Sequence, residues 1–158
     1  MALVSDVLDQ LVAIVSGVTP DTVYFETRSF RHLEAAYDSE TGRTQDATRR
    51  FVLLPTGDRQ WTGWMGTAGA QLEVEAEFGL DILYRQGQSA AQFFKVVAED
   101  VDRLTWELQR NTNYSAATSG ISKIEASGYS IDLGGEAQNA MAIVSIGVTV
   151  TYLPTFTG

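Results

Sequence analysis

The sequence predicts an α+β fold, in which two helices pack on one face of a mainly antiparallel sheet and long inter-strand loops connect the elements. Two segments carry apolar residues at the spacing of amphipathic helices, and two others alternate apolar and polar residues as half-buried strands do. The elements follow one another as helix, strands, helix, strands. The 158 residues contain no internal repeat and no linker, so we expect a single domain over residues 1–158.

The first helix is predicted over residues 3–16, and Gly17 and Pro20 end it. A short extended segment is expected at Thr22–Arg28, which is rich in β-branched and aromatic residues. The apolar face of the helix consists of Leu3, Val4, Val7, Leu8, Leu11, Val12 and Val15.

Two long loops separate the next strands. Residues 35–48 are polar and show no periodicity, and loops of this length are usually functional or disordered. The strand Arg49–Leu54 follows and ends at Pro55. The second loop, residues 56–70, contains Gly57, Gly63, Gly66 and Gly69 together with Trp61, Trp64 and Met65.

A long alternating strand is predicted at Leu72–Tyr84. It spans roughly 43 Å at the strand rise of about 3.3 Å per residue, and Gly79 marks an expected bulge or bend. Its even-numbered residues are apolar, and its other face carries Glu73, Glu75, Glu77 and Asp81. Successive carboxylates on one strand face form a row rather than converge on a point, so we interpret them as a solvated or lumen-facing surface rather than a metal or acid–base site.

The second helix is predicted to begin after the N-cap Ser89 and to end near Arg110. Its expected apolar stripe consists of Ala90, Phe93, Phe94, Val97, Val101, Leu104 and Leu108. Its expected outer face consists of Lys95, Glu99, Asp100, Asp102 and Arg103.

Two strands complete the predicted sheet. Ile121–Ser127 alternates weakly, and Gly128–Gly135 supplies a turn or a short continuation. Ala140–Leu153 alternates regularly and ends before Pro154. We expect it to pair with Leu72–Tyr84, and both strands to bury their even-numbered faces under the two helices.

The residue types and motifs in the sequence indicate a protein that is not an enzyme. The chain has no cysteine, which excludes disulfides and thiolate metal sites, and His32 is its only histidine. No nucleophile elbow or zinc-protease motif is present. The glycines at 63, 66 and 69 precede a strand rather than a helix, so they do not form a phosphate loop. We expect no catalytic residues, no cofactor and no metal.

Charge and the N-terminal sequence restrict the partners further. The net charge is −9 and the sequence pI is near 4.4, which is the opposite of what nucleic-acid binding requires. The N-terminal residues lack a basic region, and Asp6 and Asp9 interrupt their apolar run. We therefore expect neither a signal peptide nor a membrane span, and synthesis in the cytoplasm.

Two groups of residues are candidates for a subunit or partner interface. Trp61, Trp64 and Met65 either cap the sheet as part of the core, or anchor another subunit, or form a carbohydrate platform. Positive charge gathers around the first long loop, where it either forms a solvated surface or meets the acidic row Glu73–Asp81 of a neighbouring copy and builds a ring. The basic residues are Arg28, Arg31, Arg43, Arg49 and Arg50.

In the order of its elements over residues 3–153, the chain resembles the tail terminator proteins of long-tailed bacteriophages. An amphipathic helix precedes a strand ending in Leu53-Leu54-Pro55 and a long loop. The alternating strand Gln71–Arg85, a helix with an acidic outer face and the closing strand Ala142–Tyr152 follow. The chain departs from the family in the additional segment Thr22–Thr48.

The resemblance implies a structural virion protein of the tail or neck, without enzymatic activity. Such proteins form a ring, usually hexameric, that terminates tail-tube polymerisation and provides the surface for head joining. The implied partners are the chain itself, the tail tube protein and a head-completion or connector protein; DNA passes through the lumen without specific binding, and no membrane is involved. Two alternatives remain: another neck, head–tail connector or tail-tube-like component, and a carbohydrate- or ligand-binding module that uses Trp61 and Trp64.

Overall fold

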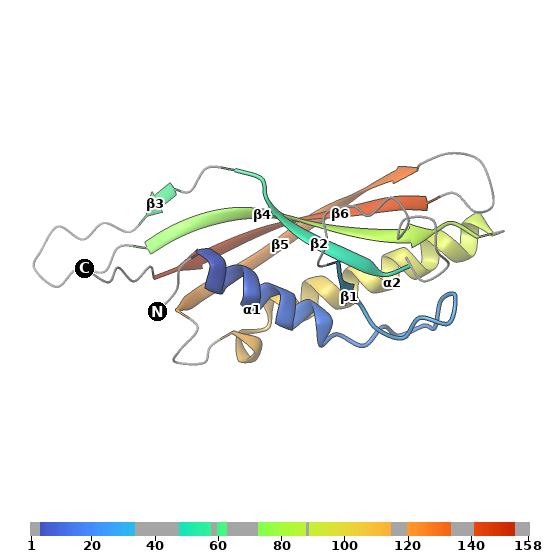
Figure 1. Ribbon diagram of the computed structural model, residues 1–158, viewed down its shortest axis with the longest axis horizontal. Coiled ribbons are helices and arrows are strands. Elements are labelled where there is room, and N and C mark those ends of the chain that lie inside the picture. The colour runs from blue at the N-terminus through green and yellow to red at the C-terminus, as the bar shows by residue number, and fades with distance from the viewer. Residues whose placement is uncertain are drawn as a thin grey trace, which may run out of the picture.

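The structure is a computed structural model that describes residues 4–33, 48–57, 60–62, 73–87, 89–114, 120–133 and 141–153. It confirms the α+β fold with two α-helices (Figure 1). The helices are α1 (Val4–Ser16) and α2 (Ala90–Gln109), and a single 3₁₀ turn, η3 (Asn111–Asn113), follows α2. The strands are β1 (Arg31–His32), β2 (Arg50–Pro55), β3 (Gln60–Thr62), β4 (Glu73–Arg85), β5 (Ile121–Leu133) and β6 (Met141–Tyr152).

The strands form one sheet in the order β1-β2-β4-β6-β5. Only β1 and β2 run parallel; the other neighbours are antiparallel, and β3 pairs with the first residues of β4 on the same side as β2. The predicted pairing of the two long alternating strands is confirmed, because β4 and β6 are in register from Val74 opposite Tyr152 to Arg85 opposite Met141. Gly79 lies opposite Gly147 within this unbroken register, so the expected bulge in β4 is wrong.

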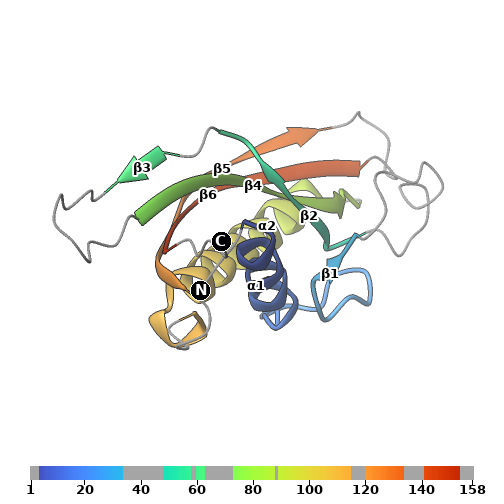
Figure 2. The same ribbon diagram turned by 60° about the vertical axis from the view of Figure 1, so that its left-hand side comes forward.

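The core lies between the sheet and the two helices, which cover the same sheet face (Figure 2). Period-2 alternation places every even-numbered side chain of β4 and β6 on this face. As predicted, these side chains are buried: Val74, Ala76, Phe78, Leu80, Ile82 and Tyr84 from β4, and Ala142, Val144, Ile146, Val148, Val150 and Tyr152 from β6. From α1, Val7, Leu11, Ile14 and Val15 complete the core.

The segment predicted as a strand at Thr22–Arg28 is instead a tight turn. Tyr24 and Thr27 bridge each other, and Phe25 and Glu26 between them adopt left-handed backbone conformations with φ of 47° and 62°. Strand propensity is overruled here by tertiary contacts. The Tyr24 hydroxyl donates to the carbonyl oxygens of Arg85 and Gln86, which holds the turn against the end of β4.

The second helix begins as predicted, since the Gln92 amide donates to the Ser89 hydroxyl over 3.2 Å. Its expected apolar stripe needs two corrections. Ala90 and Phe94 are exposed: Ala90 is the first residue of the helix, and Phe94 lies beyond the edge of the buried face, which centres on Phe93, Val97 and Leu104. Asp100, expected outside, is buried.

The remaining strands differ from the sequence prediction in extent. Of the two alternatives expected for Gly128–Gly135, the structure shows the continuation, because β5 extends to Leu133, with irregular register after Ile121 and after Ser127 where Gly128 takes a φ of 64°. β3 lies inside the loop predicted at 56–70, and β1 was not predicted at all. The predicted loop at 35–48 lies outside the described residues except for its last position.

Candidate functional site

Most of the predicted interface residues fall into three groups: arginines at or near the surface, a tryptophan on β3, and residues outside the described part of the chain. Arg28 and Arg31 are exposed, and Arg50 is partly buried in β2. Trp61 lies on β3, where its backbone pairs with Val74. Trp64, Met65 and Arg43 lie outside the described residues.

Arg49 is the exception, and its predicted place on the surface is wrong. Its relative exposure is 0%. The residue precedes β2 with a left-handed φ of 63°, which turns its side chain away from solvent. Its amide donates to the Leu83 carbonyl over 2.6 Å, so the strained backbone is fixed at the edge of β4.

The Arg49 guanidinium forms a two-point ion pair with Asp100 of α2. Nε donates to Oδ2 over 2.8 Å and Nη2 donates to Oδ1 over 2.9 Å. The third nitrogen, Nη1, donates to the Thr27 carbonyl over 2.9 Å, and the group lies 5.8 Å from the centre of the Phe30 ring. Fork-shaped pairing of this kind fixes both partners in one orientation.

Tyr84 of β4 completes this cluster by donating its hydroxyl hydrogen to Asp100 Oδ2 over 2.6 Å. Burial raises the pKa of the Tyr84 phenol well above its ordinary value, and the neighbouring Asp100 carboxylate raises it further. Burial also raises the pKa of the Asp100 carboxyl, while the bonds from Arg49 and Tyr84 oppose that rise. We call Arg49, Asp100 and Tyr84 the buried ionic cluster.

The buried ionic cluster is a structural element rather than a reaction centre. All three side chains are almost completely enclosed, and each polar atom is bonded within the cluster or to backbone. The sequence held one signal for it: Asp100 follows Val97 by three positions and precedes Leu104 by four, which places it on the apolar helix face. No local signal identifies Arg49.

The acidic row lies on the sheet face opposite the helices, as the alternation predicted. Glu73 and Glu75 are partly exposed and Glu77 is exposed. Their cross-strand neighbours are uncharged: Thr62 opposite Glu73, Gln60 and Thr151 opposite Glu75, and Thr149 opposite Glu77. The fourth acid, Asp81, accepts a hydrogen bond from Ser145 over 2.7 Å. The three glutamates form no ion pair within the described part of the chain, although Lys123 of β5 interacts electrostatically with Glu75.

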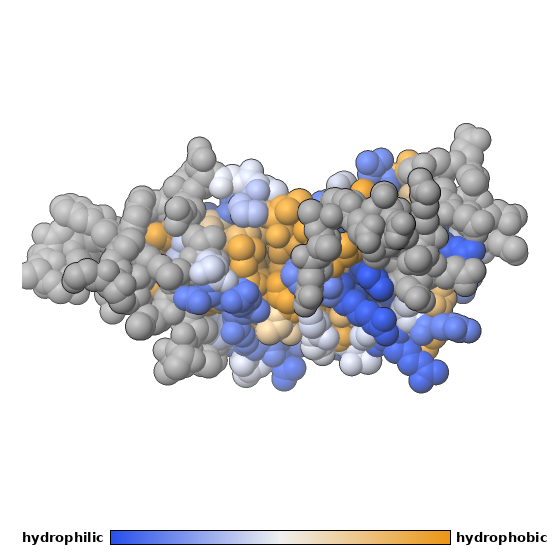
Figure 3. Space-filling view, in the orientation of Figure 1, coloured by the Kyte–Doolittle hydropathy of each residue, from blue (hydrophilic) through white to orange (hydrophobic). Residues whose placement is uncertain are grey.

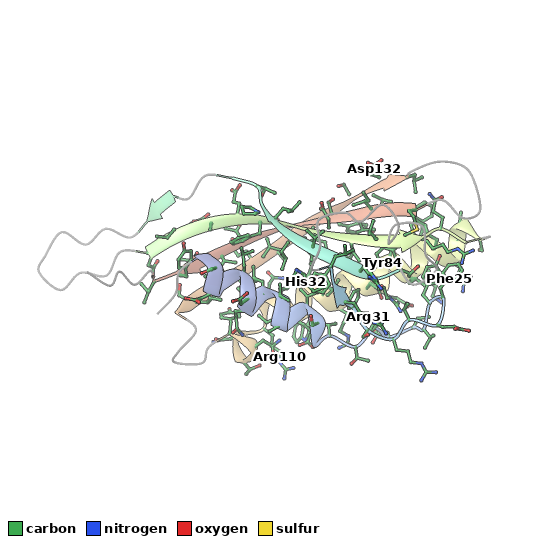
Figure 4. The ribbon with its side chains drawn as sticks, in the orientation of Figure 1. Phe25, Arg31, His32, Tyr84, Arg110 and Asp132 are labelled. Carbon is green, nitrogen blue, oxygen red and sulfur yellow. The ribbon has the colours of Figure 1, made fainter. Side chains whose placement is uncertain are left out.

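A cavity of about 500 Å³ opens beside the buried ionic cluster. Three arginines line it: Arg28, Arg31 and, from the end of β4, Arg85. Figure 4 shows Arg31, Phe25 and Tyr84 near the end of the molecule where α2 begins, well away from Arg110. The cavity therefore brings together two of the predicted basic residues with one that the sequence analysis did not single out.

Exposed apolar side chains mark the second half of β5. Tyr129 and Leu133 are 47% and 51% exposed, although they lie opposite the buried Ile146 and Ala142. Figures 1 and 2 both show this part of β5 well away from α2.

On another face, Figure 3 shows a hydrophobic band across the middle of the molecule, where β2 crosses above α1 in Figure 1. Leu54 of β2 is also exposed.

His32 is exposed on β1, with its ring 5.3 Å from that of Phe51. Among the described residues, no group of three His, Cys, Asp or Glu side chains could hold a metal ion. Over the same residues, each helix is too short or too polar to cross a membrane. No protein-family model matches the sequence, and a search of curated proteins finds no match.

Proposed function

We propose that the protein is a structural subunit that assembles into a ring at the head-proximal end of a phage tail, ends tube polymerisation there and joins the head. The observation that carries the assembly part is the free second half of β5. β5 is the last strand of the described sheet, so the outer backbone groups of Ser127–Leu133 have no strand partner among the described residues. From Ser127 to Leu133, six of the seven residues are exposed and Ile131 is partly buried.

An edge strand of this kind is normally shortened, charged or covered, because it pairs readily with other chains. β5 instead runs for 13 residues and presents Tyr129 and Leu133 on the same sheet face as the core, beyond the part of that face that the helices cover. In the assembled ring, a neighbouring subunit would cover the aromatic side chain of Tyr129 and the methyl groups of Leu133. Its backbone would pair with the free edge of β5. The tail position itself rests on the resemblance in element order.

The charged surfaces supply a second contact for such a ring. The acidic row Glu73, Glu75 and Glu77 lies on the outer sheet face, while the basic residues lie at the edge near β1 and β2. Because these surfaces differ, they fit a head-to-tail contact between successive subunits, the arrangement that closes into a ring. Arg28, Arg31 and Arg50 remain in this proposal; Arg49 does not.

The direct test is a mass measurement with negative-stain images of the purified protein, alone and with tail tubes. Rings, or caps on the tube ends, are expected. The variant Tyr129→Lys/Leu133→Lys should lose them, because it places two charges on the contact surface. Trp106→Lys is the control, since Trp106 is 64% exposed and lies on α2 rather than on β5.

Three outcomes would count against the proposal. A monomer that neither forms rings nor caps tubes overturns it. Rings that survive the β5 substitutions but are lost in Trp106→Lys move the interface to α2. Images that place the protein along the tube or at the portal, rather than at the tube end, favour a tube or neck component.

A further inference from the structure

The cavity beside the buried ionic cluster has the size and the lining of a small-anion site. Its volume of about 500 Å³ lies within the roughly 300–1,000 Å³ of ligand pockets. Its cationic lining residues are Arg28, Arg31 and Arg85, and its hydroxyl groups include that of Thr48. One carboxylate, that of Glu26, also lines it. The lining thus carries three positive charges and one negative charge in a chain whose net charge is −9.

Two of these arginines are unpaired within the described part of the chain. Arg28 and Arg31 are exposed and form no ion pair with any described residue, Glu26 included. Arg49, the nearest further cation, is different because Asp100 neutralises it. Placing unpaired guanidinium groups around one concavity is electrostatically unfavourable, and an anion between them would relieve their repulsion.

The walls of the cavity are fixed by the same contacts that fix the fold. The Thr27 carbonyl accepts from Arg49 Nη1, and the Arg31 amide donates to the Arg49 carbonyl over 3.0 Å. The Arg85 guanidinium stacks 4.7 Å from the centre of the Phe25 ring. Stacking on an aromatic ring and backbone anchoring restrict these groups before any ligand arrives, which lowers the entropy lost on binding.

We propose that this cavity binds a small oxyanion with at least two negative charges, held by Arg28, Arg31 and Arg85. The guanidinium fork matches carboxylate and phosphate oxygens equally well, so the shared chemistry is a pair of oxyanion groups. The site shares Arg28 and Arg31 with the basic surface of the proposed ring contact, but binding of a small anion by one subunit does not require the ring to form.

The test is calorimetric titration with inorganic pyrophosphate and with citrate, at constant ionic strength. One-to-one binding of at least one probe is expected, and the probe that binds more tightly identifies the phosphate or the carboxylate source. Arg28→Ala and Arg31→Ala should each weaken binding by about tenfold or more, because each removes hydrogen bonds to a charged group. Both side chains are exposed, so urea midpoints should stay close to wild type.

Arg110→Ala is the matched control, because Arg110 is an exposed arginine at the far end of α2 and its loss changes the net charge equally. It should leave binding unchanged. The inference is overturned if neither probe binds with a Kd below about 1 mM. It is also overturned if Arg110→Ala weakens binding as much as the cavity variants do, since that result would indicate a diffuse charge effect.

Discussion

Arg49 shows how one residue can be misjudged from its neighbours in the sequence. It stands beside Arg50 in a polar surrounding and resembles a surface cation, yet it is the largest of the fully buried side chains. Burial of a guanidinium requires a paired carboxylate and satisfaction of its remaining donors. Asp100, 51 positions later, and the Thr27 carbonyl meet that requirement. Because the partners are remote in sequence, no pattern around Arg49 could predict its burial.

Removing one partner of this pair should be strongly destabilising. Asp100→Ala leaves the Arg49 guanidinium buried without its counter-ion, and we expect a loss of roughly 3–5 kcal/mol in the free energy of unfolding measured in urea. The control is Arg103→Ala, which breaks the exposed ion pair of Arg103 with Asp21. Solvent screens that pair, so its loss should have little effect. If Asp100→Ala and Arg103→Ala lowered the free energy of unfolding equally, the buried ion pair would contribute no more to stability than the exposed one.

At the scale of elements, length and periodicity decided what the sequence could predict. α1, α2, β4 and β6 were predicted to within a few residues, because each repeats its pattern over several turns or many alternations. β1 and β3 have two and three residues, too few to show any period. The turn at Tyr24–Thr27 was missed because its left-handed residues are Phe and Glu rather than glycine or asparagine.

Three glycine-to-alanine substitutions are expected to lower stability by different amounts, according to the backbone conformation and the space at each site. Gly87, between β4 and α2, has a φ of 73°, and an added methyl group would lie 3.1 Å from Cζ of Phe25. Gly128 in β5 has a φ of 64° with open space around it, and Gly147 in β6 has neither constraint. We expect Gly128→Ala to cost about 1 kcal/mol through its backbone alone. Gly87→Ala should cost more, and Gly147→Ala should cost nothing.

Urea midpoints of the three glycine variants check this order. The comparison is internally controlled, because the same methyl group is added at each site. A Gly87→Ala variant that is no less stable than Gly147→Ala would show that the turn Tyr24–Thr27 yields easily. Such a result would weaken the claim that the cavity walls are fixed.

For the whole molecule, the buried phenol of Tyr84 links stability to alkaline pH. Its pKa is raised well above 10.0 in the folded protein, whereas the unfolded chain ionises near the ordinary value. The unfolded state then binds fewer protons, so stability is complete below about pH 10 and falls as the pH rises above it. Tyr84→Phe should reduce this alkaline loss of stability, measured as the urea midpoint against pH.

The reduction should be partial, because burial also raises the pKa of Tyr24. Tyr84→Phe is in addition expected to lower stability at neutral pH, since Asp100 loses a hydrogen-bond donor. The two effects can be distinguished in a plot of the urea midpoint against pH. Loss of the raised Tyr84 pKa changes the slope at alkaline pH, whereas loss of the hydrogen bond to Asp100 lowers the midpoint at every pH. An unchanged slope would contradict the linkage.

The buried ionic cluster also constrains how the protein can open locally. It joins α2 through Asp100, β4 through Tyr84 and the Tyr24–Thr27 turn through Arg49. If α2 separated alone, the guanidinium would lose its counter-ion inside an apolar layer, so that motion carries nearly the penalty of global unfolding. In contrast, the second half of β5 has few buried side chains to lose. In hydrogen exchange, the amides of α2 around Asp100 and of β4 around Tyr84 should therefore exchange together and slowly, while those after Ser127 exchange first.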